Sequence, residues 1–253
     1  ICYAIVHVDD MLFAASNEDT IVNATKSLNK FFELKSLGDV QHYLGVEVSR
    51  NENGVFSIAQ TQYITKIAKE HQLENSKGSK YPIDPGYHKL EDDDMLSCNT
   101  EYRKVIGQLL YISNNTRPDI SASVSILAQR VEKPRSLDFT GALRIVRYLV
   151  STKDLKLNLY DETESIHLRG FSDSDWAEDR LTRKSISGMI CKVLGGTVSW
   201  SSRKQDVVAL STTEAEFYAL AETIKEVQWL EYILNDFDII VEAPILVNSD
   251  NQS

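Results

Sequence analysis

The chain has 253 residues, 42% hydrophobic and 25% charged, and 27 Lys and Arg against 37 Asp and Glu give a formal net charge of −10. This size allows a substantial core, compatible with two domains, and the sequence contains no run of about 18 apolar residues that could span a membrane. Three widely spaced cysteines, Cys2, Cys98 and Cys191, disfavour both a disulfide framework and a zinc site, so we expect an intracellular, reducing compartment.

The charge is unevenly distributed. Although a net negative charge disfavours nucleic-acid binding, residues 130–156 contain seven Lys or Arg against three acids, and residues 180–204 contain six and no acid. Two interpretations stay open for each block. It could follow nucleic-acid phosphates, or it could be a solvated helix face or hairpin.

In chain order, the first pattern is a hairpin. Tyr3 to Val8 is typical of a buried strand, and the apolar segment Met11 to Ala15 follows Asp9 and Asp10. The pattern therefore predicts a turn that presents both carboxylates. Adjacent like charges are costly unless a cation lies between them, although an ordinary acidic turn would have the same sequence.

Alternating helices and strands follow. Apolar spacing predicts a helix over Glu18 to Leu34, a strand over Val40 to Val48, and a second helix over Thr61 to Leu73. Between the strand and the second helix, Asn51 to Gly54 predicts a hairpin turn leading into Val55 to Ile58.

A polar segment from Asn75 to Asn99 is the best candidate for a linker. Beyond it, periodic apolar residues predict helices over Tyr102 to Ile112, Ile120 to Arg130 and Leu137 to Leu149, with Pro118 near the start of the second. These would form a small helical subdomain.

The last part of the chain places carboxylates at the ends of three elements. Ile166 to Asp173 is typical of an apolar strand, Ser211 with Glu214 forms a capping box that opens a long helix, and Pro244 to Asp250 is a short strand ending in Asp. The candidate ligands are Asp173 or Asp175, Glu214 or Glu216, and Asp250.

Carboxylates from a strand, a helix and another strand are suited to a divalent-metal site. Cleaving a phosphodiester requires stabilisation of negative charge on the attacking and leaving oxygens, which two Mg²⁺ ions about 4 Å apart can provide. Mg²⁺ prefers oxygen ligands and retains several waters, so a few Asp and Glu side chains suffice.

The ordered set of motifs resembles the reverse transcriptase and RNase H part of a copia-type LTR retrotransposon Pol polyprotein. The resemblance runs through essentially all 253 residues. It is carried by His7–Asp10, Leu37–Asp39, Tyr43–Val48, Gln60–Ile64, Gly107–Tyr111, Thr116–Ile120, Arg147–Leu149, Ser187–Gly188, Ser199–Gln205 and Ala209–Glu216.

The resemblance implies a mixed α/β (α+β) fold in three parts. Residues 1–85 would be the end of a reverse transcriptase palm, a primer-grip hairpin and the start of the thumb. Residues 86–160 would be a helical thumb or connection region, and residues 161–253 an RNase H-like domain. In that domain, segments 166–173, 188–193 and 196–200 should be antiparallel, and segment 245–250 should lie parallel to the first, after a helix over Thr212 to Asn235.

By resemblance, Asp173, Glu216 and Asp250 are the catalytic, metal-binding carboxylates of an RNase H site that uses Mg²⁺, with Mn²⁺ as an alternative. Asp175 is a weaker alternative to Asp173, and Glu214 is better explained as the capping acid. The family's fourth RNase H carboxylate lies farther downstream than Ser253, so we expect weakened metal binding.

Asp9 and Asp10 resemble the catalytic, metal-binding pair of the polymerase palm, with Asp9 the better ligand. The Asp that completes that site in the family lies upstream of Ile1, so we expect that this chain alone does not polymerise DNA. Two departures stand out. His7 replaces the usual Tyr, and Asp138 stands where the family often has His.

Three functions follow from the resemblance: a fragment of a polymerase and ribonuclease H, an RNA–DNA hybrid-binding module without turnover, or a relic whose fold serves protein contacts. The partners would be RNA–DNA hybrid and primer-template, with no membrane. The location would be cytoplasmic, in a virus-like particle, or nuclear.

Overall fold

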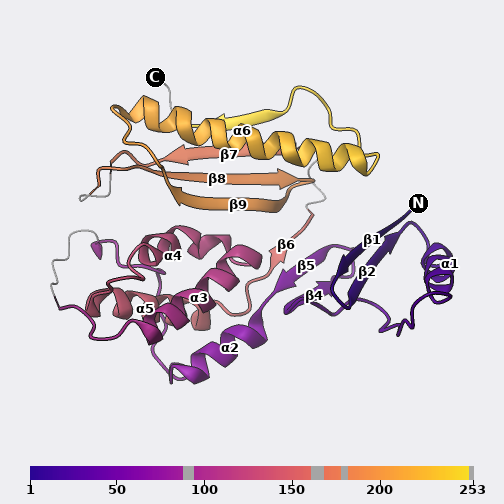
Figure 1. The fold of residues 1–253 in the computed structure, drawn as a ribbon, viewed down its shortest axis with the longest axis horizontal. Helices are drawn as coiled ribbons and strands as arrows, with labels where there is room; N and C mark the ends of the chain where they lie inside the picture. The colour runs from indigo at the N-terminus through magenta and orange to yellow at the C-terminus, as the bar shows by residue number, and fades with distance from the viewer. Residues whose placement is uncertain (88–93, 161–167, 178–181, 251–253) are drawn as a thin grey trace.

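The computed structural model describes residues 1–87, 94–160, 168–177 and 182–250, and confirms a mixed α/β fold. Figure 1 shows an upper layer, in which helix α6 covers a four-stranded sheet, above a lower layer of helices and a second four-stranded sheet with shorter strands. A two-stranded hairpin lies to one side of the lower layer. Across the described ranges, no helix combines the length and apolar character needed to cross a membrane.

The predicted N-terminal hairpin is confirmed. Strands β1 (Cys2–His7) and β2 (Asp10–Ala15) pair antiparallel, with His7 opposite Asp10, and Val8 takes a positive φ in the turn. β1 is largely exposed, so the prediction of a buried strand is wrong. The reason is that the described residues add no third strand to this sheet.

Helix α1 (Glu18–Leu28) ends six residues before the predicted Leu34. Asn17 caps the start of this helix, and its side-chain oxygen accepts a hydrogen bond from the N–H of Thr20 at 2.9 Å. At its other end the Asn29 side chain accepts from the N–H of Leu34 at 2.9 Å, so the chain turns back instead of continuing as a helix.

A second sheet has the order β3 (His42–Tyr43), β4 (Val46–Arg50), β5 (Phe56–Ala59), β6 (Leu157–Asn158). The single strand predicted over Val40 to Val48 is wrong. Leu44 and Gly45 both take positive φ, as in a type I′ turn, and divide the segment into β3 and β4. The predicted hairpin of β4 and β5 is confirmed.

Strand β6 comes from about a hundred residues downstream of its partner β5. Ser57 on β5 pairs with Asn158 on β6, and the Ser57 hydroxyl donates to the Asn158 side-chain oxygen at 2.8 Å. The chain therefore returns to the second sheet before it enters the upper layer (Figure 1).

The main core lies among the helices α2 (Thr61–Glu70), α3 (Thr100–Asn115), α4 (Ser121–Ala128) and α5 (Ser136–Ser151), with the short 3₁₀ helix η2 (Pro118–Ile120) before α4. The three helices predicted after the linker are thus present, with η2 forming the start of the second. The buried side chains include Ile64, Ile67, Tyr102, Val105, Ile106, Leu109, Ile112, Ile120, Val124, Leu127, Ile145 and Leu149.

Asp138, a departure from the family pattern, is fully buried at the start of α5. It accepts a hydrogen bond from the Tyr87 hydroxyl at 2.6 Å and forms an ion pair with Arg135 at 2.7 Å. It also accepts from the Arg135 backbone N–H at 2.8 Å, which caps the helix. The carboxylate therefore joins the segment before α3 to the start of α5.

The upper sheet has the order β10 (Leu246–Ser249), β7 (Leu168–Ser174), β8 (Ile186–Val193), β9 (Gly196–Lys204). β7, β8 and β9 are antiparallel and β10 is parallel to β7, as predicted. Ile166, where the first strand was expected to begin, lies outside the described residues.

Helix α6 (Thr212–Asp236) covers one face of this sheet because its buried side chains recur every three or four residues. Gly170 on β7 lets the helix approach closely. A Cβ there would lie 3.0 Å from side-chain atoms of Thr223 and Val227. The buried residues of the helix are Ala215, Ala219, Thr223, Val227, Leu230 and Leu234.

The two layers are joined by a hydrogen bond at their interface. The indole N–H of Trp200, on β9, donates to the backbone carbonyl of Ser113, on α3, at 2.8 Å. The upper sheet is therefore tied directly to the helical core.

Candidate metal centre

Three elements of the upper layer bring carboxylates to one end of the sheet. Asp173 lies near the end of β7, and Asp250 directly follows β10. The two strands are parallel, with Ser249 opposite Ser172, so both run toward the same edge. Glu216 lies in the second turn of α6.

The structure brings the three predicted side chains together. One carboxylate oxygen each from Asp173, Glu216 and Asp250 lies within 4.8 Å of the other two. This is well inside the separation of about 8 Å beyond which the two aspartates could not share a pair of ions. A parallel crossover explains the proximity, since it returns the chain to the edge from which it left.

Glu216 is held by one oxygen. Its Oε1 accepts hydrogen bonds from the backbone N–H of Ser174 at 3.1 Å and from the Ser174 hydroxyl at 3.0 Å. Its Oε2 is buried and has no hydrogen-bond partner among the described residues. A buried acceptor without a partner costs about 1–3 kcal/mol, and more when charged, so this oxygen is suited to a cation.

The donor set fits a hard divalent cation. Asp173 and Asp250 are exposed and Glu216 is half-buried, which leaves the triad open to water and substrate on one side. Mg²⁺ takes oxygen ligands and keeps several waters, so it requires few protein ligands of this type. Three carboxylates this close repel one another without positive charge between them.

The two alternative acids have structural roles. The Ser211 hydroxyl accepts from the N–H of Glu214 at 3.1 Å, and the Glu214 carboxylate accepts from the N–H of Leu210 at 2.7 Å. Glu214 is thus a capping acid, although its partner is Leu210 instead of the expected Ser211. The Asp175 carboxylate accepts from the N–H of Ile186 at 2.6 Å, beside the strand pair β7–β8.

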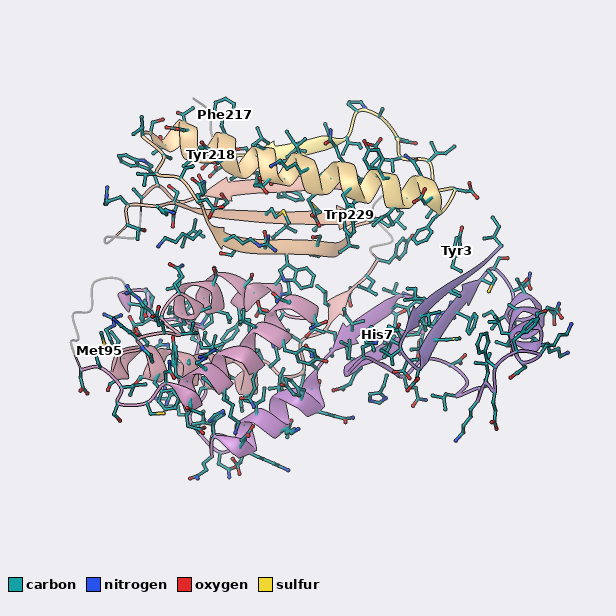
Figure 2. The ribbon with its side chains drawn as sticks, in the orientation of Figure 1. Tyr3, His7, Met95, Phe217, Tyr218 and Trp229 are labelled. Carbon is teal, nitrogen blue, oxygen red and sulfur yellow. The ribbon has the colours of Figure 1, made fainter. Side chains whose placement is uncertain are left out.

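Sequence reasoning missed Ser174. The signal was its place on β7, where Leu168, Gly170 and Ser172 alternate as the buried positions. Ser174 continues that series and so lies on the face that α6 covers. The next residues of α6 after Glu216, Phe217 and Tyr218, are exposed (Figure 2).

Asp9 and Asp10 lie in the turn and first strand position of the β1–β2 hairpin. This hairpin lies beside the lower layer, whereas the triad is in the upper layer (Figure 1), and His7 is exposed (Figure 2). Within the described part of the chain, no third His, Cys, Asp or Glu joins this pair in a group able to hold one ion. The hairpin therefore presents two carboxylates and not a complete site.

Two arginines of the basic segment 130–156 form ion pairs within the protein. Arg135 pairs with buried Asp138 at 2.7 Å, and Arg144 pairs with Asp84 at 3.2 Å. Arg180, the first residue of the second basic segment, lies outside the described residues. That these segments follow phosphates stays a prediction.

Comparison with known proteins identifies the family. Residues 3–85 match the family model described as "Reverse transcriptase (RNA-dependent DNA polymerase)". The chain is 32% identical over 252 residues to the retrovirus-related Pol polyprotein from transposon RE1 of Arabidopsis thaliana. It is 31% identical over 227 residues to the putative transposon Ty5-1 protein YCL074W of Saccharomyces cerevisiae, with 89% of this chain and 73% of that protein covered.

This chain belongs to the copia-type retrotransposon Pol family. The match to the RE1 Pol polyprotein covers 99% of this chain but 17% of the length of that polyprotein. The chain is also 32% identical over 228 residues to an uncharacterized mitochondrial protein of Arabidopsis thaliana, with 90% of this chain and 93% of that protein covered. The family predicted from the motifs is thus confirmed.

Proposed function

We propose that residues 161–253 are the RNase H-like domain of a copia-type Pol protein and hydrolyse the RNA strand of RNA–DNA hybrids. The observation that carries the proposal is the convergence of Asp173, Glu216 and Asp250 from β7, α6 and β10, within 4.8 Å. Residues 1–85 would be the end of the reverse transcriptase palm with the start of the thumb, and residues 86–160 the connection.

The three carboxylates would hold Mg²⁺, with Mn²⁺ as an alternative. When bound, the ions would stabilise negative charge on the attacking and leaving oxygens of the phosphodiester. The protein's own part is placement. Asp173 stands on β7, and Asp250 directly follows the adjacent parallel strand β10. Glu216 reaches them from α6, and hydrogen bonds from Ser174 fix its carboxylate. Their exposure leaves a face open to a nucleic-acid backbone.

For the polymerase part, we propose that Asp9 and Asp10 are two members of a palm site that this chain does not complete. Purified chain should therefore fail to extend a primed template with dNTPs. Incorporation by the unaltered chain would contradict this part of the proposal without bearing on the ribonuclease part.

The test is cleavage of an RNA–DNA hybrid labelled on its RNA strand, with and without Mg²⁺. We expect cleavage by the full chain, loss of cleavage in Asp173→Asn and Glu216→Gln, and retention in Glu222→Gln. Glu222 is a matched control because it lies on the same helix and forms an exposed ion pair with Lys225. Asp9→Asn should also cleave normally.

Three outcomes separate the functions. Cleavage lost in Asp173→Asn supports the ribonuclease. Salt-sensitive hybrid binding without cleavage by the unaltered chain would replace it with a binding module, because phosphate contacts weaken as salt rises. Neither binding nor cleavage would leave a protein whose fold serves other contacts.

A further inference from the structure

Ser174 donates two hydrogen bonds to one carboxylate of the triad. Its backbone N–H and its hydroxyl both donate to Oε1 of Glu216, at 3.1 and 3.0 Å. Two donors from one residue on the same oxygen restrict rotation of the carboxylate group. The other oxygen, Oε2, is left buried without a hydrogen-bond partner among the described residues.

The position of Ser174 in the fold makes this contact specific. It directly follows Asp173 on β7, and it lies on the strand face that packs against α6. One backbone segment thus supplies a carboxylate of the triad and the two donors that orient a second carboxylate. Any shift of α6 along the sheet would break both bonds.

We propose that Ser174 is a positioning residue, which holds Glu216 so that its unpaired oxygen is available to a divalent cation. The inference rests on the proposed function, since it assigns a role toward the metal that the triad would hold. Groups that orient a metal ligand typically change metal affinity by 10- to 100-fold when removed.

The same helix offers a matched control. The hydroxyl of Ser199 on β9 donates to Oε1 of Glu226 on α6 at 2.6 Å, which is also a bond from a strand serine to a helix glutamate. Glu226 lies ten residues after Glu216, about 15 Å farther along the helix. Removing the Ser199 hydroxyl should disturb the helix–sheet contact equally without reaching the triad.

The experiment is a calorimetric titration of the full chain with Mn²⁺, in a background carrying Asp9→Asn and Asp10→Asn so that the palm pair does not contribute. We expect Ser174→Ala to weaken the Kd by at least about tenfold. Ser199→Ala should leave the Kd unchanged, and Ser174→Thr, which restores a hydroxyl, should recover most of the affinity. Thermal unfolding midpoints show whether each variant is folded.

The outcomes separate the two proposals. A wild-type Kd in folded Ser174→Ala, an equal loss in Ser199→Ala, or a Ser174→Thr protein as weak as the alanine variant would each overturn the role of Ser174 and leave the metal site standing. No Mn²⁺ binding by the chain with intact Asp173, Glu216 and Asp250 would overturn the proposed metal site, and the role of Ser174 with it.

Discussion

Substitutions in the buried ion pair between Asp138 and Arg135 should be among the most destabilising in the helical core. We predict that Asp138→Asn lowers the free energy of unfolding by about 3 kcal/mol. Asp138 is 0% exposed and accepts hydrogen bonds from the Arg135 guanidinium, the Arg135 N–H and the Tyr87 hydroxyl. An asparagine has one acceptor oxygen and no charge, so it leaves some of these donors unpaired.

The magnitude follows from burial. Breaking a buried ion pair by removing one partner costs about 3–5 kcal/mol, because the remaining charge is left desolvated. Arg135 retains 18% exposure of its side chain, so water can reach the guanidinium, and the expected cost lies at the lower end of that range.

The matched control is Asp84→Asn, which removes the carboxylate from another Asp–Arg pair beside α5. The side chains of Arg144 and Asp84 are 31% and 49% exposed, so this pair should contribute less than about 1 kcal/mol. Urea denaturation followed by circular dichroism measures both variants. A loss below about 1 kcal/mol in Asp138→Asn, or equal losses in both, would refute the argument from burial.

Three further predictions concern acid stability, thiol reactivity and helix capping. Burial acts to raise the pKa of Asp138, but hydrogen bonds from Arg135 and Tyr87 outweigh it and lower that pKa. For Asp119, burial again acts to raise the pKa, and hydrogen bonds from Arg117 and Tyr148 again lower it overall. A carboxylate whose pKa is lower in the folded than in the unfolded state stabilises the fold at pH values above its unfolded pKa of about 4. The urea concentration at the unfolding midpoint, measured from pH 7 to pH 3, should therefore decrease once the pH is below about 4. This decrease should be less steep in Asp138→Asn, which lacks one of the two carboxylates. Burial raises the pKa of the Cys191 thiol to about 11, whereas hydrogen bonds with Thr100 lower the pKa of exposed Cys98. Iodoacetamide should therefore label Cys98 before Cys191 in the native protein, and faster labelling of Cys191 would contradict the burial of its side chain. Ser211→Ala removes the cap of α6 and should cost about 1 kcal/mol in thermal or urea unfolding, with Ser201→Ala, at a half-buried position on β9, as a comparison; an unchanged midpoint in Ser211→Ala would show that the cap contributes nothing.

Much of the architecture was accessible from local sequence patterns. Periodic apolar residues indicated α2, α3 and α5, the capping box of Ser211 and Glu214 indicated the start of α6, and the acidic turn indicated the β1–β2 hairpin. These signals are local, because a helix or a tight hairpin is specified by residues a few positions apart. The same locality placed Asp173 and Asp250 at strand ends, where a parallel crossover brings them to one edge.

The sequence predictions were wrong where a turn or a side-chain hydrogen bond interrupts a continuous apolar pattern. Leu44 and Gly45 form a turn inside an apolar run that looked like one strand, and the Tyr111 hydroxyl donates to the Leu44 carbonyl at 2.7 Å from a distant helix. In α1, the side chain of Asn29 bonds a backbone N–H five residues ahead and ends the helix before Leu34. Apolar spacing alone continues through both points.

The sequence by itself determined which residues could be ligands, which elements carry them, and the family to which the chain belongs. Tertiary structure alone decided how the side chains around these candidate ligands are paired. Ser174 meets Glu216, and Asp138 meets Tyr87, only because elements 42 and 51 residues apart pack together. At both contacts, burial makes an unpaired oxygen or charge costly. The periodicity of the sequence does not indicate which distant group will form the hydrogen bond or ion pair.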